Sequence, residues 1–171
     1  MKTTAMLAVL PPIQPLHFEP NGLYICLLDR GETYNFHWEL YLAQTATTGV
    51  ICHIVNDKGP SLWEFQTIPT NELPSLHRLL VALKIGTVTP MMHRPLCNRL
   101  GLIPLDLFSA RYGESLTCRV WIKEALFALD DEGYVILAVN VADIDREANH
   151  HALIAKSQHE RRIRTSRAFR E

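Results

Sequence analysis

The hydrophobic pattern of this 171-residue chain changes near residue 74, and the change separates a strand-forming half from a helix-forming half. Before that point, short apolar or alternating segments are joined by short loops rich in Gly, Asn, Asp and Thr. After it, apolar side chains recur at helical spacing. This order favours an α+β fold, in which an antiparallel sheet of about four to six strands packs against a core helix and a further C-terminal helix follows.

Four strands are expected in the first half, over residues 23–28, 36–42, 50–55 and 62–68. The short loops between them predict an antiparallel meander. In residues 36–42 the side chains alternate, so that the strand has one apolar and one polar face. The apolar face carries Phe36, Trp38, Leu40 and Leu42, and the polar face carries His37, Glu39 and Tyr41.

The clearest helix begins near Thr117. Either Thr117 or Ser115 can cap its start, and Gly133 lies just past its end. Its apolar stripe follows the helical period. The stripe consists of Cys118, Trp121, Ile122, Ala125, Leu126 and Leu129.

Three further elements follow from the pattern of the second half. Leucine spacing after Pro74 predicts a helix over residues 74–84. Residues 134–141 form an apolar run typical of a strand. From Ala142 the pattern becomes helical and polar, and residues 155–171 carry six Lys or Arg against two Glu. We interpret this last segment as a basic tail, helical or frayed.

The chain is therefore divided into an extended arm over residues 1–22, a single α+β domain over residues 23–141, and a C-terminal helix with the basic tail over residues 142–171. A weak likeness to a signal peptide in the first twelve residues is interrupted by Pro11-Pro12, so we assign these residues to the arm. One of three hypotheses about function is an interaction protein that forms a homodimer or docks on a partner through this C-terminal helix.

Composition argues against several partners. The net charge is −1, which gives no electrostatic reason to expect nucleic acid, and no stretch approaches the apolar length of a membrane span. The four cysteines form no CxxC pair, so we expect reduced thiols and a cytoplasmic protein. Phosphate-binding loops, dinucleotide-binding loops and zinc-binding motifs are absent, and His150-His151 is too short a cluster for a metal site. The sequence thus predicts neither a metal nor a cofactor.

Cys118 is placed where a nucleophile would be effective, because the unpaired N–H groups at a helix start favour a thiolate. His37 on its strand can supply the imidazole that takes the thiol proton. His53 on the next strand, or Glu39, could orient His37 if the hairpin register brings them together. Each residue also has a structural interpretation: Cys118 as core packing and His37 as a hydrogen-bonded strand residue.

The order of these motifs resembles the circularly permuted papain-like superfamily, which includes NlpC-type hydrolases and lecithin retinol acyltransferase. The similar segments are "HWELYL" (residues 37–42), "VICHIV" (residues 50–55) and "TCRVWIKEAL" (residues 117–126). The chain also resembles an uncharacterised group of small fungal proteins with an "HW", "WxF", "IGxV" and "CRxW" order. The resemblance implies Cys118 as nucleophile, His37 as base and His53 as orienter. Thr117 stands where those acyltransferases usually have Asn.

Two enzymatic or binding functions follow as hypotheses. The first is a cysteine-dependent hydrolase or acyltransferase that acts on an amide, ester or thioester of a small molecule through an acyl-cysteine. The second is a non-thiol small-molecule-binding protein, cyclase or isomerase of a fungal biosynthetic pathway, in which His37, Glu39 and Tyr41 form an acid–base wall and Cys118 only packs. In either case we expect Glu39, Tyr41 and Trp121 to contact the substrate.

Overall fold

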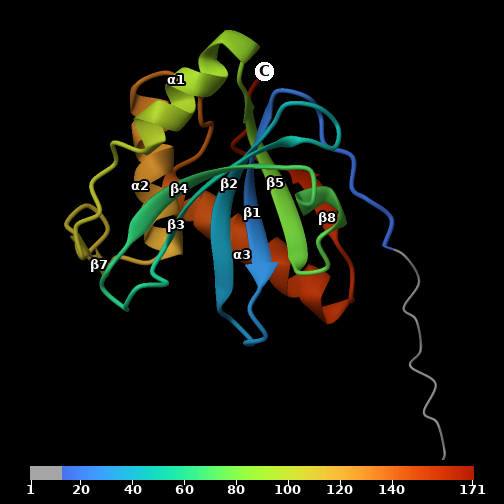
Figure 1. The fold of residues 1–171 in the computed structure, drawn as a ribbon, viewed down its shortest axis with the longest axis horizontal. Coiled ribbons are helices and arrows are strands. Elements are labelled where there is room, and N and C mark those ends of the chain that lie inside the picture. Colours follow the sequence, from blue (N-terminus) through green and yellow to red (C-terminus); the bar gives the residue numbers. More distant parts are fainter. Residues whose placement is uncertain (1–12) are drawn as a thin grey trace, which may run out of the picture.

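The computed structural model describes residues 13–171, and its main feature is a twisted six-stranded sheet (Figure 1). The spatial order of the strands is β4-β3-β2-β1-β5-β8. All neighbours are antiparallel except β5 and β8, which are parallel. The strands are β1 (Gly22–Asp29), β2 (Phe36–Ala43), β3 (Gly49–Val55), β4 (Glu64–Thr70), β5 (Leu79–Thr87) and β8 (Arg162–Thr165).

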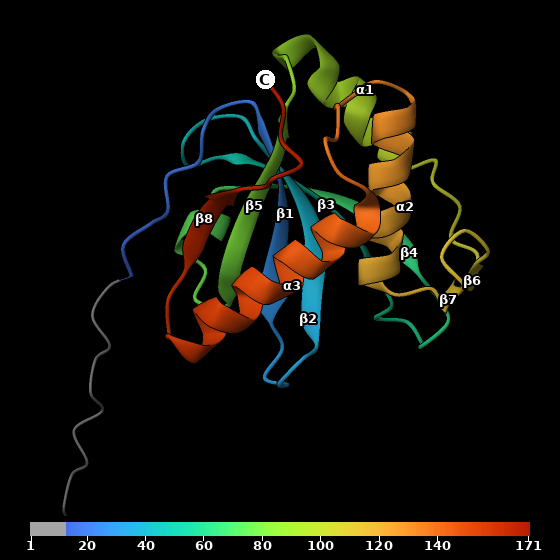
Figure 2. The same cartoon turned by 180° about the vertical axis from the view of Figure 1, so that it is seen from behind.

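Three α-helices accompany the sheet, and two of them cover one of its faces. Figure 2 shows α3 crossing that face, with α2 beside it. The helices are α1 (Pro90–Leu100), α2 (Cys118–Asp131) and α3 (Val141–Ser157), and the short elements are the 3₁₀ turn η1 (Leu73–Ser75) and the strands β6 (Phe108–Ser109) and β7 (Glu114–Ser115).

The predicted α+β architecture is confirmed, including the antiparallel meander β1 to β4 and the C-terminal helix. The core helix α2 begins at Cys118, as its cap predicts: the side chain of Thr117 accepts a hydrogen bond from the Val120 N–H at 3.2 Å. Gly133 follows the helix with a positive φ of 77°, the conformation that ends many helices.

The sheet separates two hydrophobic cores. The larger core lies under the helices and includes Phe36 and Trp38 of β2 together with Cys118 and Trp121 of α2. The smaller core lies on the other face, where Phe18 of the N-terminal segment and Leu73 of η1 cover Tyr24 and Tyr41. Because this smaller cover is partial, part of the second face stays open.

The helix predicted over residues 74–84 is wrong. Only η1 is helical there, and β5 begins at Leu79 and runs through the middle of the sheet between β1 and β8. Its continuous apolar run, LLVALKIG, is buried on both faces, and such a strand lacks the alternation that distinguishes strand from helix. An irregularity in the pairing of β5 with β1 between Leu27 and Leu28 disturbs the period further.

The strand predicted over residues 134–141 is also absent. These residues form an irregular connection from α2 to α3, and the side chain of Val135 fills the larger core. The Leu137 N–H donates to Asp130 Oδ1 at 2.9 Å and the Ala138 N–H donates to the Ala168 carbonyl at 2.8 Å. Of this apolar run only Val135 is buried, and Ile136 is 66% exposed, so the run indicated neither a strand nor a continuous buried segment.

The basic tail is helical only over residues 155–157, the end of α3, and it is not frayed beyond them, because residues 162–165 form β8. The segment just after β8 is bound to α3: Glu147 of α3 accepts hydrogen bonds from the Ser166 hydroxyl at 2.7 Å and from the Arg167 N–H at 3.1 Å. The C-terminal segment is thus an integral part of the sheet, and α3 packs against β1 and β5.

The expected arm over residues 1–22 is described only from residue 13, so the prediction for the first twelve residues falls outside the described part of the chain. Leu16 and Phe18 of the arm pack on the smaller core. Among residues 13–171, no helix has the length and apolar character needed to cross a membrane. The homodimer through the C-terminal helix stays a prediction.

Candidate functional site

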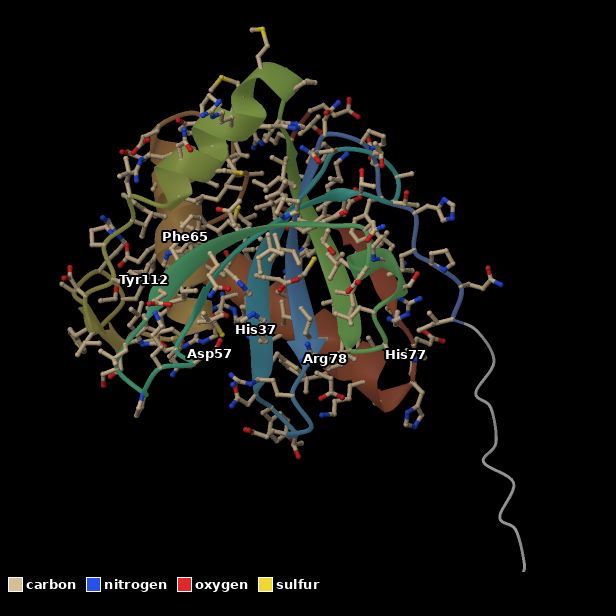
Figure 3. The ribbon with its side chains drawn as sticks, in the orientation of Figure 1. His37, Asp57, Phe65, His77, Arg78 and Tyr112 are labelled. Carbon is tan, nitrogen blue, oxygen red and sulfur yellow. The ribbon has the colours of Figure 1, made fainter. Side chains whose placement is uncertain are left out.

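Two titratable side chains of β2 lie on the sheet face away from the helices. Because strand side chains alternate, and because Phe36 and Trp38 enter the larger core, His37 and Glu39 face the opposite way. Figure 3 shows His37 on this open face, with Arg78 at the start of β5 to one side and Asp57 of the β3–β4 loop to the other. The alternation predicted for residues 36–42 is thereby confirmed.

His53 joins this pair through the register of β3: its neighbours Cys52 and Ile54 enter the larger core, so His53 between them faces the same side as Glu39. The ladder between the two strands ends at the pair of Leu40 with Cys52. Beyond that pair, the His53 ring reaches His37, so that His53 Nδ1 lies 2.9 Å from His37 Nε2. The register that the sequence left open therefore brings the two histidines into hydrogen-bond contact.

Glu39 completes a compact cluster. Its Oε2 atom lies 3.7 Å from His37 Nε2 and 3.7 Å from His53 Nδ1. The carboxyl is deeply buried, and among the described residues its Oε1 atom has no hydrogen-bond partner. Burial raises the pKa of Glu39 to about 8, and the nearby positive charge of Arg78 opposes this only in part.

Both histidines are held in their neutral form. Burial, reinforced by the neighbouring His53 ring and by the charges of Arg30 and Arg78, lowers the pKa of His37 to about 4. Burial also lowers the pKa of His53. The three side chains differ in access: His37 is 20% exposed, His53 is 11% exposed and Glu39 is 3% exposed. A molecule from solvent would therefore meet His37 first.

The structure does not pair Cys118 with either histidine. Cys118 belongs to the larger core under the helices, whereas His37 and His53 face the other side of the sheet. Its Sγ atom lies 3.8 Å from the Phe36 carbonyl oxygen, and no hydrogen bond joins it to a histidine among residues 13–171. The nucleophile–base pair implied by the papain-like resemblance is thus not formed.

Cys118 does border a cleft of about 570 Å³, which Arg30, Asn35 and Trp63 also line. No histidine lines this cleft in the described part of the chain. Burial raises the pKa of the Cys118 thiol, despite its place at the start of α2. The desolvation of the thiol therefore outweighs the effect of the helix N-terminus, and the thiol is protonated near neutral pH.

The other two expected substrate contacts are core residues. Tyr41 is fully buried against Phe18, with ring centroids 4.7 Å apart, and lies on the same sheet face as Glu39. Trp121 is fully buried in the larger core beside Phe65, with ring centroids 5.7 Å apart. Of the predicted site residues, the structure brings together His37, Glu39 and His53 only.

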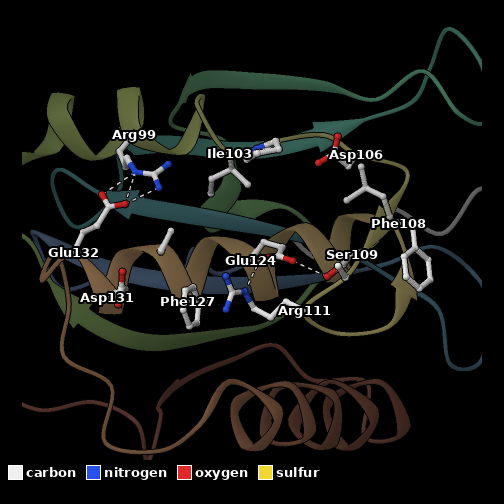
Figure 4. A pocket seen from close by; sticks show the side chains of 14 residues that line it. Arg99, Ile103, Asp106, Phe108, Ser109, Arg111, Glu124, Phe127, Asp131 and Glu132 are labelled. Carbon is white, nitrogen blue, oxygen red and sulfur yellow. Dashed lines mark hydrogen bonds and ion pairs between the residues drawn. The ribbon is translucent and has the colours of Figure 1, made fainter.

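A second cleft, of about 390 Å³, lies between α2 and the segment that follows α1 (Figure 4). Its charges are largely paired with one another. Arg99 binds Glu132 through two nitrogen atoms, and Glu124 accepts hydrogen bonds from Ser109 and Arg111. These ion pairs and hydrogen bonds fix the walls of the cleft. The paired side chains are therefore not free to act on a ligand in the way that the histidine–glutamate cluster could.

Two features near the cluster were not predicted from the sequence. Cys52, next to His53 in sequence but directed into the larger core, lies 3.6 Å from Cys97 of α1, sulfur to sulfur. Arg78 makes no salt bridge among the described residues and lies exposed at the edge of the open face. Both depend on the position of β5 and α1, which the pattern did not predict.

Comparison with known proteins places the whole sheet in one family, because a single family model matches residues 21–170. The chain belongs to the DUF6914 family, a family of unknown function. The matched region contains every strand and helix described above, and therefore His37, Glu39, His53 and Cys118. No curated protein and no solved structure matches the chain.

Proposed function

We propose that this DUF6914 protein binds a small molecule at the His37–Glu39–His53 cluster and transforms it by proton transfer, as an isomerase or cyclase does, without a cysteine nucleophile. The observation that carries the proposal is the convergence of the three polar atoms within 3.7 Å of one another on an open sheet face. Three titratable groups with displaced pKa values at one place are typical of a reactive site.

The protonation states support a proton-transfer role. Near pH 7 Glu39 is largely protonated and His37 is neutral, since their pKa values are about 8 and about 4. When the His37 Nε2–H donates to His53 Nδ1, the Nδ1 atom of His37 keeps a free lone pair that can accept a substrate proton. His53 thereby fixes the orientation of His37. Glu39 would give its proton to the substrate as His37 takes one from it, and the carboxylate left behind would stabilise the imidazolium that forms.

The thiol reaction has weaker support. It needs a base near Cys118, and the histidines lie in a different cluster. The cysteine-dependent hydrolase or acyltransferase therefore stays a prediction from resemblance. We also propose a cytoplasmic location, because the four cysteines are free thiols, as is usual in a reducing compartment.

Exchange of carbon-bound hydrogen for deuterium tests the proposal. The wild-type protein would be incubated in deuterium oxide with a panel of enolisable ketones and 1,3-dicarbonyl compounds, and loss of the α-proton signal would be followed by NMR. We expect exchange that His37→Ala removes and Cys118→Ser retains. If Cys118→Ser abolishes the exchange while His37→Ala leaves it intact, the proposal is wrong and the thiol mechanism is favoured.

A further inference from the structure

The three atoms that converge in the cluster are also a suitable set of metal ligands. They are His37 Nε2, His53 Nδ1 and Glu39 Oε2, separated by 2.9, 3.7 and 3.7 Å. The point equidistant from these three atoms lies about 2.0 Å from each, by the geometry of that triangle. Zinc–nitrogen and zinc–carboxylate bonds in proteins are about 2.0–2.2 Å long.

The burial of Glu39 gives an independent reason for a cation at this point. The carboxyl is 3% exposed, and its Oε1 atom has no hydrogen-bond partner among residues 13–171. Its Oε2 atom lies 3.7 Å from each of the two histidine nitrogens, which is too far for a hydrogen bond. A buried carboxylate is costly unless it is paired or coordinates a metal. An ion between the three side chains would remove that cost.

We propose that His37, Glu39 and His53 bind one divalent transition-metal ion, of the Zn²⁺ or Fe²⁺ class. Two imidazoles and one carboxylate suit these ions, whereas Mg²⁺ and Ca²⁺ prefer oxygen ligands alone. Three protein ligands leave at least one coordination position open, which is typical of catalytic rather than structural zinc. The partial exposure of His37 gives water or a small ligand a route to that position.

This inference rests on the proposed function, because it concerns the same site, and it names the cofactor of that site. A bound ion polarises a carbonyl oxygen or acidifies a water molecule, and both effects serve proton transfer next to a carbonyl group. With the ion bound through His37 Nε2, the Nδ1 atom of His37 would carry the ring proton, so a water molecule acidified by the ion, rather than His37 itself, would accept the substrate proton. Arg78, at the edge of the same face, would attract a negatively charged small molecule to it.

Isothermal titration of the full chain with Zn²⁺ tests the inference, after removal of bound metal by a chelator and of any affinity tag. We expect one ion per chain, and at least about 100-fold weaker binding in Glu39→Gln and His53→Ala, since each removes a ligand. His150→Ala is the matched control, because His150 lies on α3 outside the cluster, and its affinity should equal that of the wild type.

The variants are checked for folding by circular dichroism, because Glu39 and His53 are buried. If one unfolds, His37→Ala replaces it, since His37 is the most exposed ligand. Absence of Zn²⁺ binding, or binding that survives all three ligand variants, overturns the inference. If Zn²⁺ does not bind while proton exchange still depends on His37, the proposed function stands and the metal inference fails. If Zn²⁺ binds but the rate of proton exchange is the same in His37→Ala as in the wild type, the metal inference stands and the proposed function is wrong.

Discussion

His37 Nε2 lies 2.9 Å from His53 Nδ1, although 16 residues and a change of strand separate the two histidines. The contact exists because β3 pairs with β2 in the register that sets Leu40 opposite Cys52, and because Cys52 and Ile54 enter the larger core, so that His53 faces the same side as His37. Glu39 Oε2 lies 3.7 Å from both of these histidine nitrogens, and among residues 13–171 the buried Oε1 atom has no hydrogen-bond partner. The proposed proton transfer and the proposed metal site both depend on this cluster of three side chains.

Replacing Glu39 by Gln should stabilise the metal-free protein at high pH. The pKa of Glu39 is about 8 in the folded state against an ordinary value of 4.5. The folded state therefore loses stability as pH rises from about 4.5 to 8, by at most about 1.4 kcal/mol for each pH unit. Urea unfolding at pH 5 and pH 8 should show that Glu39→Gln gains ~2 kcal/mol over the wild type at pH 8.

The same comparison at pH 5 should show little or no gain, since Glu39 is protonated there in the folded state. His37 acts in the opposite direction between about pH 4 and 6.5, so only the difference between the two proteins isolates Glu39. Glu72→Gln, at an exposed position, is the control and should follow the wild type. Equal pH dependence of Glu39→Gln and wild type would show that Glu39 is not held protonated.

Cys118 should react slowly with iodoacetamide in the folded protein. Its side chain is 5% exposed, and burial raises the pKa of its thiol, so the reactive thiolate is scarce at pH 7. Intact mass and peptide mapping would compare its rate with that of Cys97, which is more exposed and should react first. Rapid alkylation of Cys118 that His37→Ala abolishes would instead support the thiol mechanism.

A peroxide should convert Cys52 and Cys97 into a disulfide. Their sulfur atoms lie 3.6 Å apart, and closure to the usual bond length of about 2.05 Å needs only a small movement of α1 against β3. One hydrogen peroxide molecule would oxidise the two thiols and yield two water molecules. Mass spectrometry should find a loss of about 2 Da and a cross-link between these two residues, which Cys97→Ser prevents. Cross-linking through Cys26 or Cys118 would contradict the geometry.

Removing the Glu147 carboxylate should destabilise the C-terminal strand. Its two oxygens accept hydrogen bonds from Ser166 Oγ and the Arg167 N–H, both beside β8. Glu147→Ala leaves these donors without a partner in a buried place, so we expect a loss of ~2 kcal/mol in the free energy of unfolding. Hydrogen exchange should then accelerate in residues 162–165. Unchanged exchange in that segment would show that β8 is held by other contacts.

The sequence predicted those elements that have a clear period. The alternation of residues 36–42 placed His37 and Glu39 on one face, and the apolar stripe after Thr117 located α2. The prediction from the sequence failed for β5, where apolar residues follow one another without a period because both faces of the strand are buried. It also failed for β8, whose arginines suggested a solvated tail although the strand pairs with β5 through its backbone.

The candidate site was predicted in part for the same reason. Phe36 and Trp38 share a core with Cys118, so the alternation itself implies that His37 faces away from the thiol. That consequence was available from the pattern, whereas the meeting of His53 with His37 depends on the register of β3 against β2, which the loop between them does not reveal. A His-x-Glu pair on one strand face, with a histidine on the next strand, is the signal that points to the metal-binding cluster.

Nitrogen-15 NMR of the histidine rings during Zn²⁺ addition tests the central claim most directly, because it observes each ring nitrogen separately. We predict that one equivalent of Zn²⁺ shifts the signals of His37 Nε2 and His53 Nδ1 to values typical of metal-bound nitrogen, while those of His150 and His151 stay unchanged. Unchanged His37 and His53 signals, or shifts confined to the other histidines, would contradict the account.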